Sequence, residues 1–232
     1  MSDPADPKPT STARSPHDGS VMVWDAPTRI FHWLLVLLVA VSFATGKLGG
    51  TAMQYHEWGG VAILVLVVFR VLWGFAGGTS SRFATFLRGP RQVFTYARSL
   101  LGKGHEPHLG HNPMGGWSII AMLTVLFIQA ATGLFANDDI LTEGPLFHLV
   151  SKAASDGLTR IHHTNQNILI GLVVLHLAAI VFYWVVKHDN LIAPMITGRK
   201  KWHEARDVPG GSPAKAFVLA AILAGLAYFV IY

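Results

Sequence analysis

The stretch RIHHTNQNILIGLVVLHLAAIVFYW, residues 160–184, decides the fold of this chain. It is apolar over a length that crosses a bilayer, and it carries two well-separated histidines, His162 and His176. Their spacing is just under four helical turns, so both imidazoles project from one helix face, roughly 21 Å apart along the axis. An imidazole inside a membrane is costly and usually marks function. We therefore expect two ligand sites on this helix, one near each membrane surface.

The composition of the whole chain is that of a membrane protein. Of its 232 residues, 51% are hydrophobic and only 13% are charged. The absence of cysteine excludes disulfides, thiolate-held metals, iron–sulfur clusters and covalent c-type haem within the chain. The formal charge of +5 arises from basic residues in loops that flank apolar helices, which indicates membrane orientation and not a nucleic-acid partner.

Five apolar segments have spanning length, and they predict an all-α integral membrane protein with a four-helix transmembrane bundle and a fifth, C-terminal transmembrane helix. The segments are 29–48, 56–76, 116–136, 164–186 and 215–232. The polar residues 1–20 predict a disordered tail, and no cleavage site precedes the first helix. Residues 21–200 form the predicted transmembrane domain, and 201–232 a linker and the fifth helix. Two further stretches, 86–102 and 144–158, are predicted as short surface helices.

The charge of the connections predicts the orientation in the membrane. The connection 77–115 is strongly basic, and so is the segment after the fourth helix, whereas the connection 137–163 is acidic and carries Asp138, Asp139, Glu143 and Asp156. The positive-inside rule therefore places the N-terminus and the 77–115 connection in the cytoplasm. An odd number of helices then places Tyr232 outside.

Depth along the helices pairs the four histidines of the spanning segments. His32 lies near the cytoplasmic end of the first helix, as His176 does on the fourth, whereas His56 and His162 lie near the outer ends of theirs. Each pair supplies two imidazoles from different helices, which is what bis-His haem b requires. The neighbouring His163 competes with His162, but it is rotated more than a third of a turn from His176, so we favour His162.

Other residues share these faces. Gly60 lies one turn after His56 and leaves room for a flat macrocycle, and Arg70 lies on the same face at the opposite depth. Arg70 and Arg29 are candidates for pairing with haem propionates, with a snorkelling arginine as the alternative for each. Gly133 and Gly171 are candidates for close helix packing or haem clearance. Simpler interpretations hold for the rest, namely helix packing for Gln129 and Asn165 and a solvated loop for His105, His108 and His111.

Three motifs resemble the bacterial cytochrome b561 family, which includes the cytochrome b subunits of nickel–iron hydrogenases. They are RIFHW at 29–33, HEWGG…R from 56 to 70, and RIHH…LVVLHLAA from 160 to 179, and WDAPTRIFHW at 24–33 is similar to the hydrogenase group. The resemblance covers residues 22–200. It implies a four-helix core with two b-type haems, the inner one held by His32 and His176 and the outer one by His56 and His162.

The functional hypothesis is a cytochrome of the bacterial inner membrane that relays electrons between a periplasmic redox partner and quinone. The partner can be a hydrogenase, a dehydrogenase or a periplasmic cytochrome, and a homodimer is also open. One alternative is an enzyme that oxidises superoxide, although the acidic outer connection should repel that anion unless Lys47, Lys152, Arg160 and His163 form a positive patch. Another alternative is a His-dependent metal or proton transporter, which the scarcity of acidic residues in the helices disfavours.

Overall fold

The computed structural model describes residues 19–100, 108–202 and 207–231, and within them five helices are long and apolar enough to cross a membrane. They are α1 (Ala26–Leu48), α2 (Met53–Ala76), α5 (Pro113–Gly133), α6 (Lys152–Val185) and α8 (Pro213–Ile231). The prediction of an all-α membrane protein with five spans is thus confirmed, with bounds that differ from the expected ones by a few residues at most ends.

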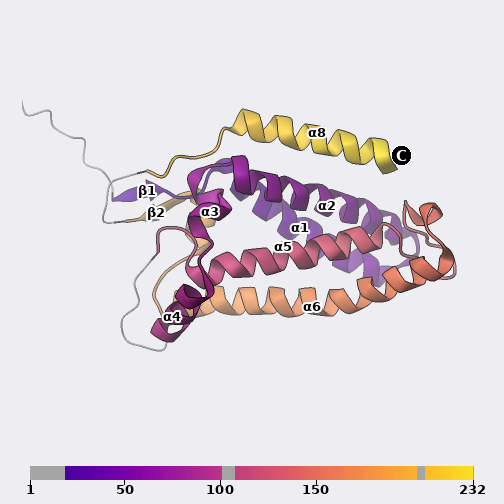
Figure 1. Cartoon of the computed structure of the whole chain (residues 1–232), viewed down its shortest axis with the longest axis horizontal. Coiled ribbons are helices and arrows are strands. Elements are labelled where there is room, and N and C mark those ends of the chain that lie inside the picture. Colours follow the sequence, from indigo (N-terminus) through magenta and orange to yellow (C-terminus); the bar gives the residue numbers. More distant parts are fainter. Residues whose placement is uncertain (1–18, 101–107, 203–206, 232) are drawn as a thin grey trace, which may run out of the picture.

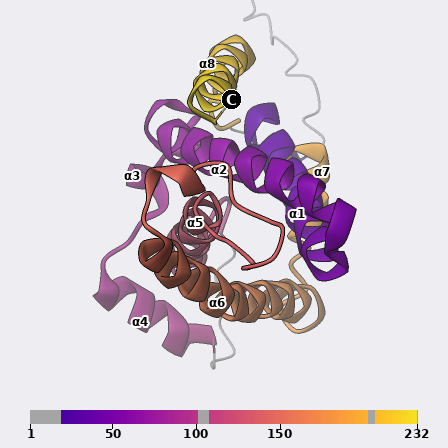
Figure 2. The same ribbon diagram turned by 90° about the vertical axis from the view of Figure 1, so that its right-hand side faces the viewer.

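Four of the long helices form one bundle and the fifth lies outside it. Contacts join α1 to α2, α2 to α5, and α5 to α6, so these helices surround a common interior (Figure 2). The fifth helix, α8, lies against the outer side of α2 (Figure 1). We call the end of the bundle with the basic connections the basic end, and the end with the α5–α6 connection the acidic end. The chain's last helix runs from the basic end to the acidic end (Figure 1).

Side-chain caps define where three of the long helices begin. Asp25 accepts a hydrogen bond from the Thr28 amide at 3.0 Å, and Asn112 accepts one from the Gly115 amide at 2.7 Å. Ser151 caps α6 in the same way. Each cap satisfies an amide that has no partner within its helix, and proline in the first turn of α1 and α5 fits there because its missing N–H is not needed.

The surface helix expected in 86–102 is confirmed, whereas that expected in 144–158 is wrong. The first is α4 (Pro90–Leu100), which follows α3 (Phe83–Phe86) and the single turn η2 (Thr79–Ser81). In the second stretch only the turn η3 (Phe147–Leu149) is separate, and residues from Lys152 onward already belong to the 34-residue α6. The Ser155 hydroxyl donates to the Phe135 carbonyl at 2.6 Å, which holds this first part of α6 against the α5–α6 connection.

A two-stranded sheet at the basic end was not predicted. Strand β1 (Ser20–Met22) pairs antiparallel with β2 (Arg199–Lys201), and β2 directly follows α7 (Ile192–Thr197). Ser20, which was expected to end the disordered tail, therefore lies in a strand, while residues 1–18 of that tail lie outside the described part. Each strand is only three residues long and its partner lies far away in the sequence. Neither strand therefore leaves a local pattern from which it could be predicted.

The linker before α8 also packs against the basic end. Its Gly211 amide donates to the buried Asp25 carboxylate at 2.9 Å, and its Pro209 carbonyl accepts from the Thr79 amide at 2.9 Å. A side chain at Gly211 would collide with Trp73, which is only 1% exposed. The start of α8 is therefore fixed to the ends of α1 and α2, and α8 is held beside the bundle by more than its apolar surface.

Candidate functional site

At the acidic end the bundle brings His56 of α2 and His162 of α6 together. Their ring centroids lie 6.1 Å apart, with the ring planes 78° to each other. The next residue, His163, is exposed on the outer side of α6. The rotation expected from helix geometry thus directs His162, and not His163, toward α2.

Backbone carbonyls set the protonation of both rings. Nδ1 of His56 lies 2.7 Å from the Ser42 carbonyl oxygen, and Nδ1 of His162 lies 2.9 Å from the Gln129 carbonyl oxygen. Since a carbonyl oxygen only accepts, each Nδ1 carries the proton and donates it, which leaves Nε2 with its lone pair. This is the arrangement typical of metal-ligating histidines, in which the second nitrogen fixes the orientation and raises the basicity of the first.

A short polar chain supports His162 from α5. The Gln129 amide nitrogen donates to Nε2 of His162 at 3.0 Å, so in this structure it takes the lone pair that a metal would bind, and the Gln129 amide oxygen accepts from the Asn165 side chain at 2.8 Å. Asn165 is 5% exposed and also donates to the Val125 carbonyl at 2.9 Å. The sequence indicated only helix packing for Gln129 and Asn165; the structure adds that they surround the candidate ligand and satisfy one another inside the bundle.

Two glycines allow the helices to approach these imidazoles. A Cβ atom at Gly46 would lie 2.8 Å from Nδ1 of His56, and one at Gly133 would lie 3.0 Å from Cε1 of His162. Around Gly60, in contrast, a Cβ would meet nothing within 4 Å, so there is open space one turn from His56. Gly46 was missed in the sequence, although it stands 14 residues after His32, the same spacing as His162 and His176.

Gly171 has a different environment from the one expected. It is exposed on α6, and a Cβ there would meet nothing within 4 Å. It therefore contributes no close helix packing among the described residues.

The basic end holds His32 of α1 and His176 of α6, the second pair that the sequence predicts. The two imidazoles are close enough to interact electrostatically. Nδ1 of His32 is buried and has no hydrogen-bond partner among the described residues. A buried imidazole nitrogen without a partner is costly, which marks this position as one that suits a bound group.

The two arginines of the predicted stripe are also at the basic end. Arg70 is 3% exposed, with its guanidinium 5.3 Å from the Phe83 ring, so it does not snorkel. Its Nη1 is buried with no partner in the described part of the chain, as is Nε of Arg29. The Arg29 side chain is held by the Ile196 carbonyl, which accepts from Nη1 at 2.6 Å. Buried guanidinium groups with free N–H donors fit an anionic group such as a carboxylate.

His111 corrects the interpretation of the 105–111 cluster as a solvated loop. Its ring lies between Trp24 and Phe86, with centroid distances of 4.5 and 4.7 Å, and its Nδ1 is buried. Burial, together with the nearby charge of Arg70, lowers the pKa of His111 from 6.5 to about 3. His108 contacts the Tyr96 ring, and His105 lies outside the described residues. Sequence alone missed this burial because the aromatic neighbours come from distant segments.

We expect the His111 environment to make the protein sensitive to acid. Between pH 6.5 and about 3 the unfolded chain binds a proton at this position and the folded chain does not, so stability falls as the pH falls through this range. Replacing His111 with phenylalanine removes the difference and should move the midpoint of acid unfolding to lower pH, as measured by circular dichroism. The exposed His148, changed to phenylalanine, is the control and should leave the midpoint unchanged; an equal shift in both variants would contradict the assignment.

The donor sets at the two ends are pairs, not complete metal sites. Among the residues that the structure describes, no group of three or more His, Cys, Asp or Glu side chains converges to hold an ion. Two imidazoles with ring centroids 6.1 Å apart, open space beside one of them, the buried guanidinium of Arg70 and the buried Nε of Arg29 suit a flat, anionic macrocycle that would supply the other four metal ligands itself. The residues present therefore fit haem.

Fold and site together define a multi-pass membrane cytochrome of the b type. The family model of prokaryotic cytochrome b561 matches residues 23–198, and this chain belongs to that family. It is thus a haem b protein of electron transport, as the motifs in the sequence predicted.

Among curated proteins the chain is similar to cytochrome subunits from several bacteria. One from Rhizobium leguminosarum bv. viciae, called a probable Ni/Fe-hydrogenase B-type cytochrome subunit, is 24% identical over 225 residues, covering 81% of this chain and 92% of the relative. A protein of the same description from Bradyrhizobium diazoefficiens is 25% identical over 221 residues, covering 80% and 87%. No solved structure matches the chain.

Proposed function

We propose that this cytochrome binds two b-type haems and relays electrons between a redox partner at the acidic end and the membrane quinone pool. The observation that carries the proposal is the pair His56 and His162, whose ring centroids lie 6.1 Å apart and whose Nδ1 atoms both donate to backbone carbonyls. The second pair, His32 and His176, belongs to the other end of the same bundle. It would hold the second haem, so the relay would have two redox centres.

The residues that would hold the haems follow from these contacts. His56 and His162 would hold the haem at the acidic end, and His32 and His176 would hold the one at the basic end. Arg29 and Arg70 would neutralise propionates with their free N–H groups, and Gly60 would leave room for the macrocycle. Bound haem b would supply one-electron redox chemistry. The haem-binding unit is then residues 21–200, with 201–232 as an added linker and helix.

The charge distribution supports an orientation with the basic end in the cytoplasm. The basic end carries Arg199 and Lys200 of β2 and the arginines of α4. The acidic end carries Asp138, Asp139 and Asp156. By the positive-inside rule the acidic end then faces the periplasm of a bacterial inner membrane. A periplasmic partner would meet the pair His56 and His162 first.

The names of the relatives favour one partner. Since similar proteins are described as subunits of nickel–iron hydrogenases, we propose that a hydrogenase docks at the acidic end and that quinone is the second substrate. Co-purification from native membranes with the tagged chain tests this choice of partner. Recovery of a dehydrogenase or a periplasmic cytochrome in place of the hydrogenase, or of a homodimer, is the alternative outcome.

The structure gives the superoxide alternative less support than the sequence did. The positive patch that it needs includes Lys152, but the Lys152 ammonium forms ion pairs with Asp139 and Asp156. These carboxylates offset the charge that would steer an anion toward the acidic end. The transporter alternative likewise lacks a converging group of three or more His, Cys, Asp or Glu side chains in the described residues.

Spectra of the purified protein test the proposal. We expect sharp b-type bands after reduction with dithionite and two haems per chain in the pyridine haemochromogen assay. In native membranes hydrogen should reduce these haems, and added quinone should reoxidise them. A colourless protein or a single haem would overturn the di-haem proposal, and reduction by another donor but not by hydrogen would overturn the choice of partner.

A further inference from the structure

The short helix α4 (Pro90–Leu100) is attached to the basic end but lies outside the bundle (Figures 1 and 2). One face of α4 fixes it there. The Tyr96 side chain is buried, and its hydroxyl is 2.7 Å from that of Tyr183 on α6, which also accepts a hydrogen bond from Asn112 at 2.9 Å. This helix is therefore held in place by a buried polar contact, with its opposite face turned away from the bundle.

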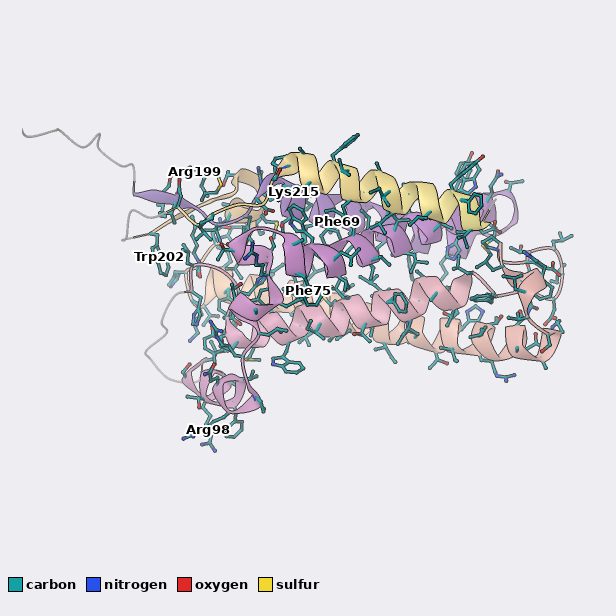
Figure 3. The ribbon with its side chains drawn as sticks, turned by 45° about the horizontal axis from the view of Figure 1, so that its top comes forward. Phe69, Phe75, Arg98, Arg199, Trp202 and Lys215 are labelled. Carbon is teal, nitrogen blue, oxygen red and sulfur yellow. The ribbon has the colours of Figure 1, made fainter. Side chains whose placement is uncertain are left out.

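The outer face of α4 is basic and aromatic. Arg91 and Arg98 are two turns apart and therefore aligned, and Arg88 lies just before the helix. All three are exposed, and none forms an ion pair with an acidic side chain in the described part of the chain. Phe94 is 58% exposed between them, and the Arg98 guanidinium lies 4.2 Å from its ring. Figure 3 shows Arg98 at the edge of the molecule, away from the long helices.

Two tryptophans indicate the depth of α4 relative to the membrane. Trp117 of α5 is 49% exposed, and its indole N–H donates to the Arg88 carbonyl at 2.8 Å. Trp184 of α6 is 54% exposed and directly follows Tyr183, the residue that anchors α4. Exposed tryptophans near the ends of spanning helices gather at the level of the lipid headgroups. The basic face of α4 thus lies at headgroup level beside the bundle, where lipid surrounds a multi-pass protein.

We propose that α4 is an interfacial helix that binds anionic phospholipid headgroups through Arg88, Arg91 and Arg98, with Phe94 in the adjoining acyl boundary. The guanidinium groups match lipid phosphates in charge and in hydrogen-bond geometry, and an exposed phenylalanine between them suits the boundary below. The site does not depend on haem, because all its residues lie outside the bundle interior.

Lipid selectivity of the full-length protein tests this assignment. The protein is reconstituted into nanodiscs of equal phosphatidylglycerol and phosphatidylcholine, and the lipids retained on release are counted by native mass spectrometry. Wild type should retain phosphatidylglycerol preferentially. The double variant R91Q/R98Q should lose most of that preference, by about fivefold for each arginine at low ionic strength, and high salt should weaken it in the wild type.

The matched control removes two positive charges from the other end of the bundle. Lys47 and Arg160 are exposed near the acidic end, so K47Q/R160Q has the same net charge as the α4 variant. This control should keep the wild-type preference. Equal loss in both double variants would show a general charge effect, and full retention in R91Q/R98Q would show that the α4 face binds something other than lipid; either result overturns the proposal. Far-ultraviolet circular dichroism establishes that each variant is folded.

Discussion

Replacing His162 with alanine is expected to remove one of two haems and to spare the other. The side chain donates to the Gln129 carbonyl and faces His56 across 6.1 Å, so its loss leaves the acidic-end site with one imidazole. Five-coordinate haem b is held far more weakly than bis-His haem, because half of its axial bonds to the protein are gone. The haem-to-protein ratio of the purified variant, from the pyridine haemochromogen assay, should fall to about half of the wild-type value.

The adjacent histidine supplies the control. His163 has the same chemistry and differs by one position, but it is exposed on α6. His163→Ala should therefore keep both haems and the wild-type spectrum. If instead His163→Ala loses a haem and His162→Ala keeps both, the ligand assignment at the acidic end is wrong, while the family and the fold are unaffected.

Adding a single methyl group at Gly46 is expected to damage the same site. In Gly46→Ala the new Cβ would lie 2.8 Å from Nδ1 of His56, whose hydrogen bond to the Ser42 carbonyl leaves the ring little freedom to move. Overpacking of this kind costs about 1–3 kcal/mol. We expect loss of haem at the acidic end and a lower melting temperature, followed by haem absorbance and by circular dichroism.

The opposite result is expected for the same change at Gly171. That position is exposed, and a Cβ there meets nothing within 4 Å. Alanine is favoured over glycine inside a helix by about 1 kcal/mol, so Gly171→Ala should keep both haems and melt no lower than the wild type. Equal behaviour of the two variants would show that Gly46 does not limit the approach of α1 to His56.

Much of the architecture could be predicted because a spanning helix is a local property. About twenty consecutive apolar residues satisfy the backbone within one segment, so 56–76 or 164–186 predicts a helix without knowledge of its neighbours. The face of His162 and His176 follows from the same regular geometry. Depth along straight helices then predicted which histidines meet, and His56 does lie beside His162.

The prediction failed where a contact depends on segments distant in sequence. The burial of His111 requires Trp24 and Phe86, and the small sheet requires Ser20 to pair with Lys201. In neither case does the sequence near one residue indicate its distant partner. The prediction of a separate surface helix in 144–158 was also wrong. The residue that caps α6, Ser151, lies well before the strongly apolar part of that helix.

The sequence by itself therefore determined the membrane class, the five helices and the shared face of His162 and His176, because each rests on composition or on helical periodicity, and its motifs indicated the family. Only the tertiary structure decided that carbonyls of Ser42 and Gln129 orient the two imidazoles at the acidic end and that Gly46 makes room for one of them. These features depend on how closely neighbouring helices approach and how each is rotated about its axis. That is set by side-chain packing between helices, which no single segment encodes.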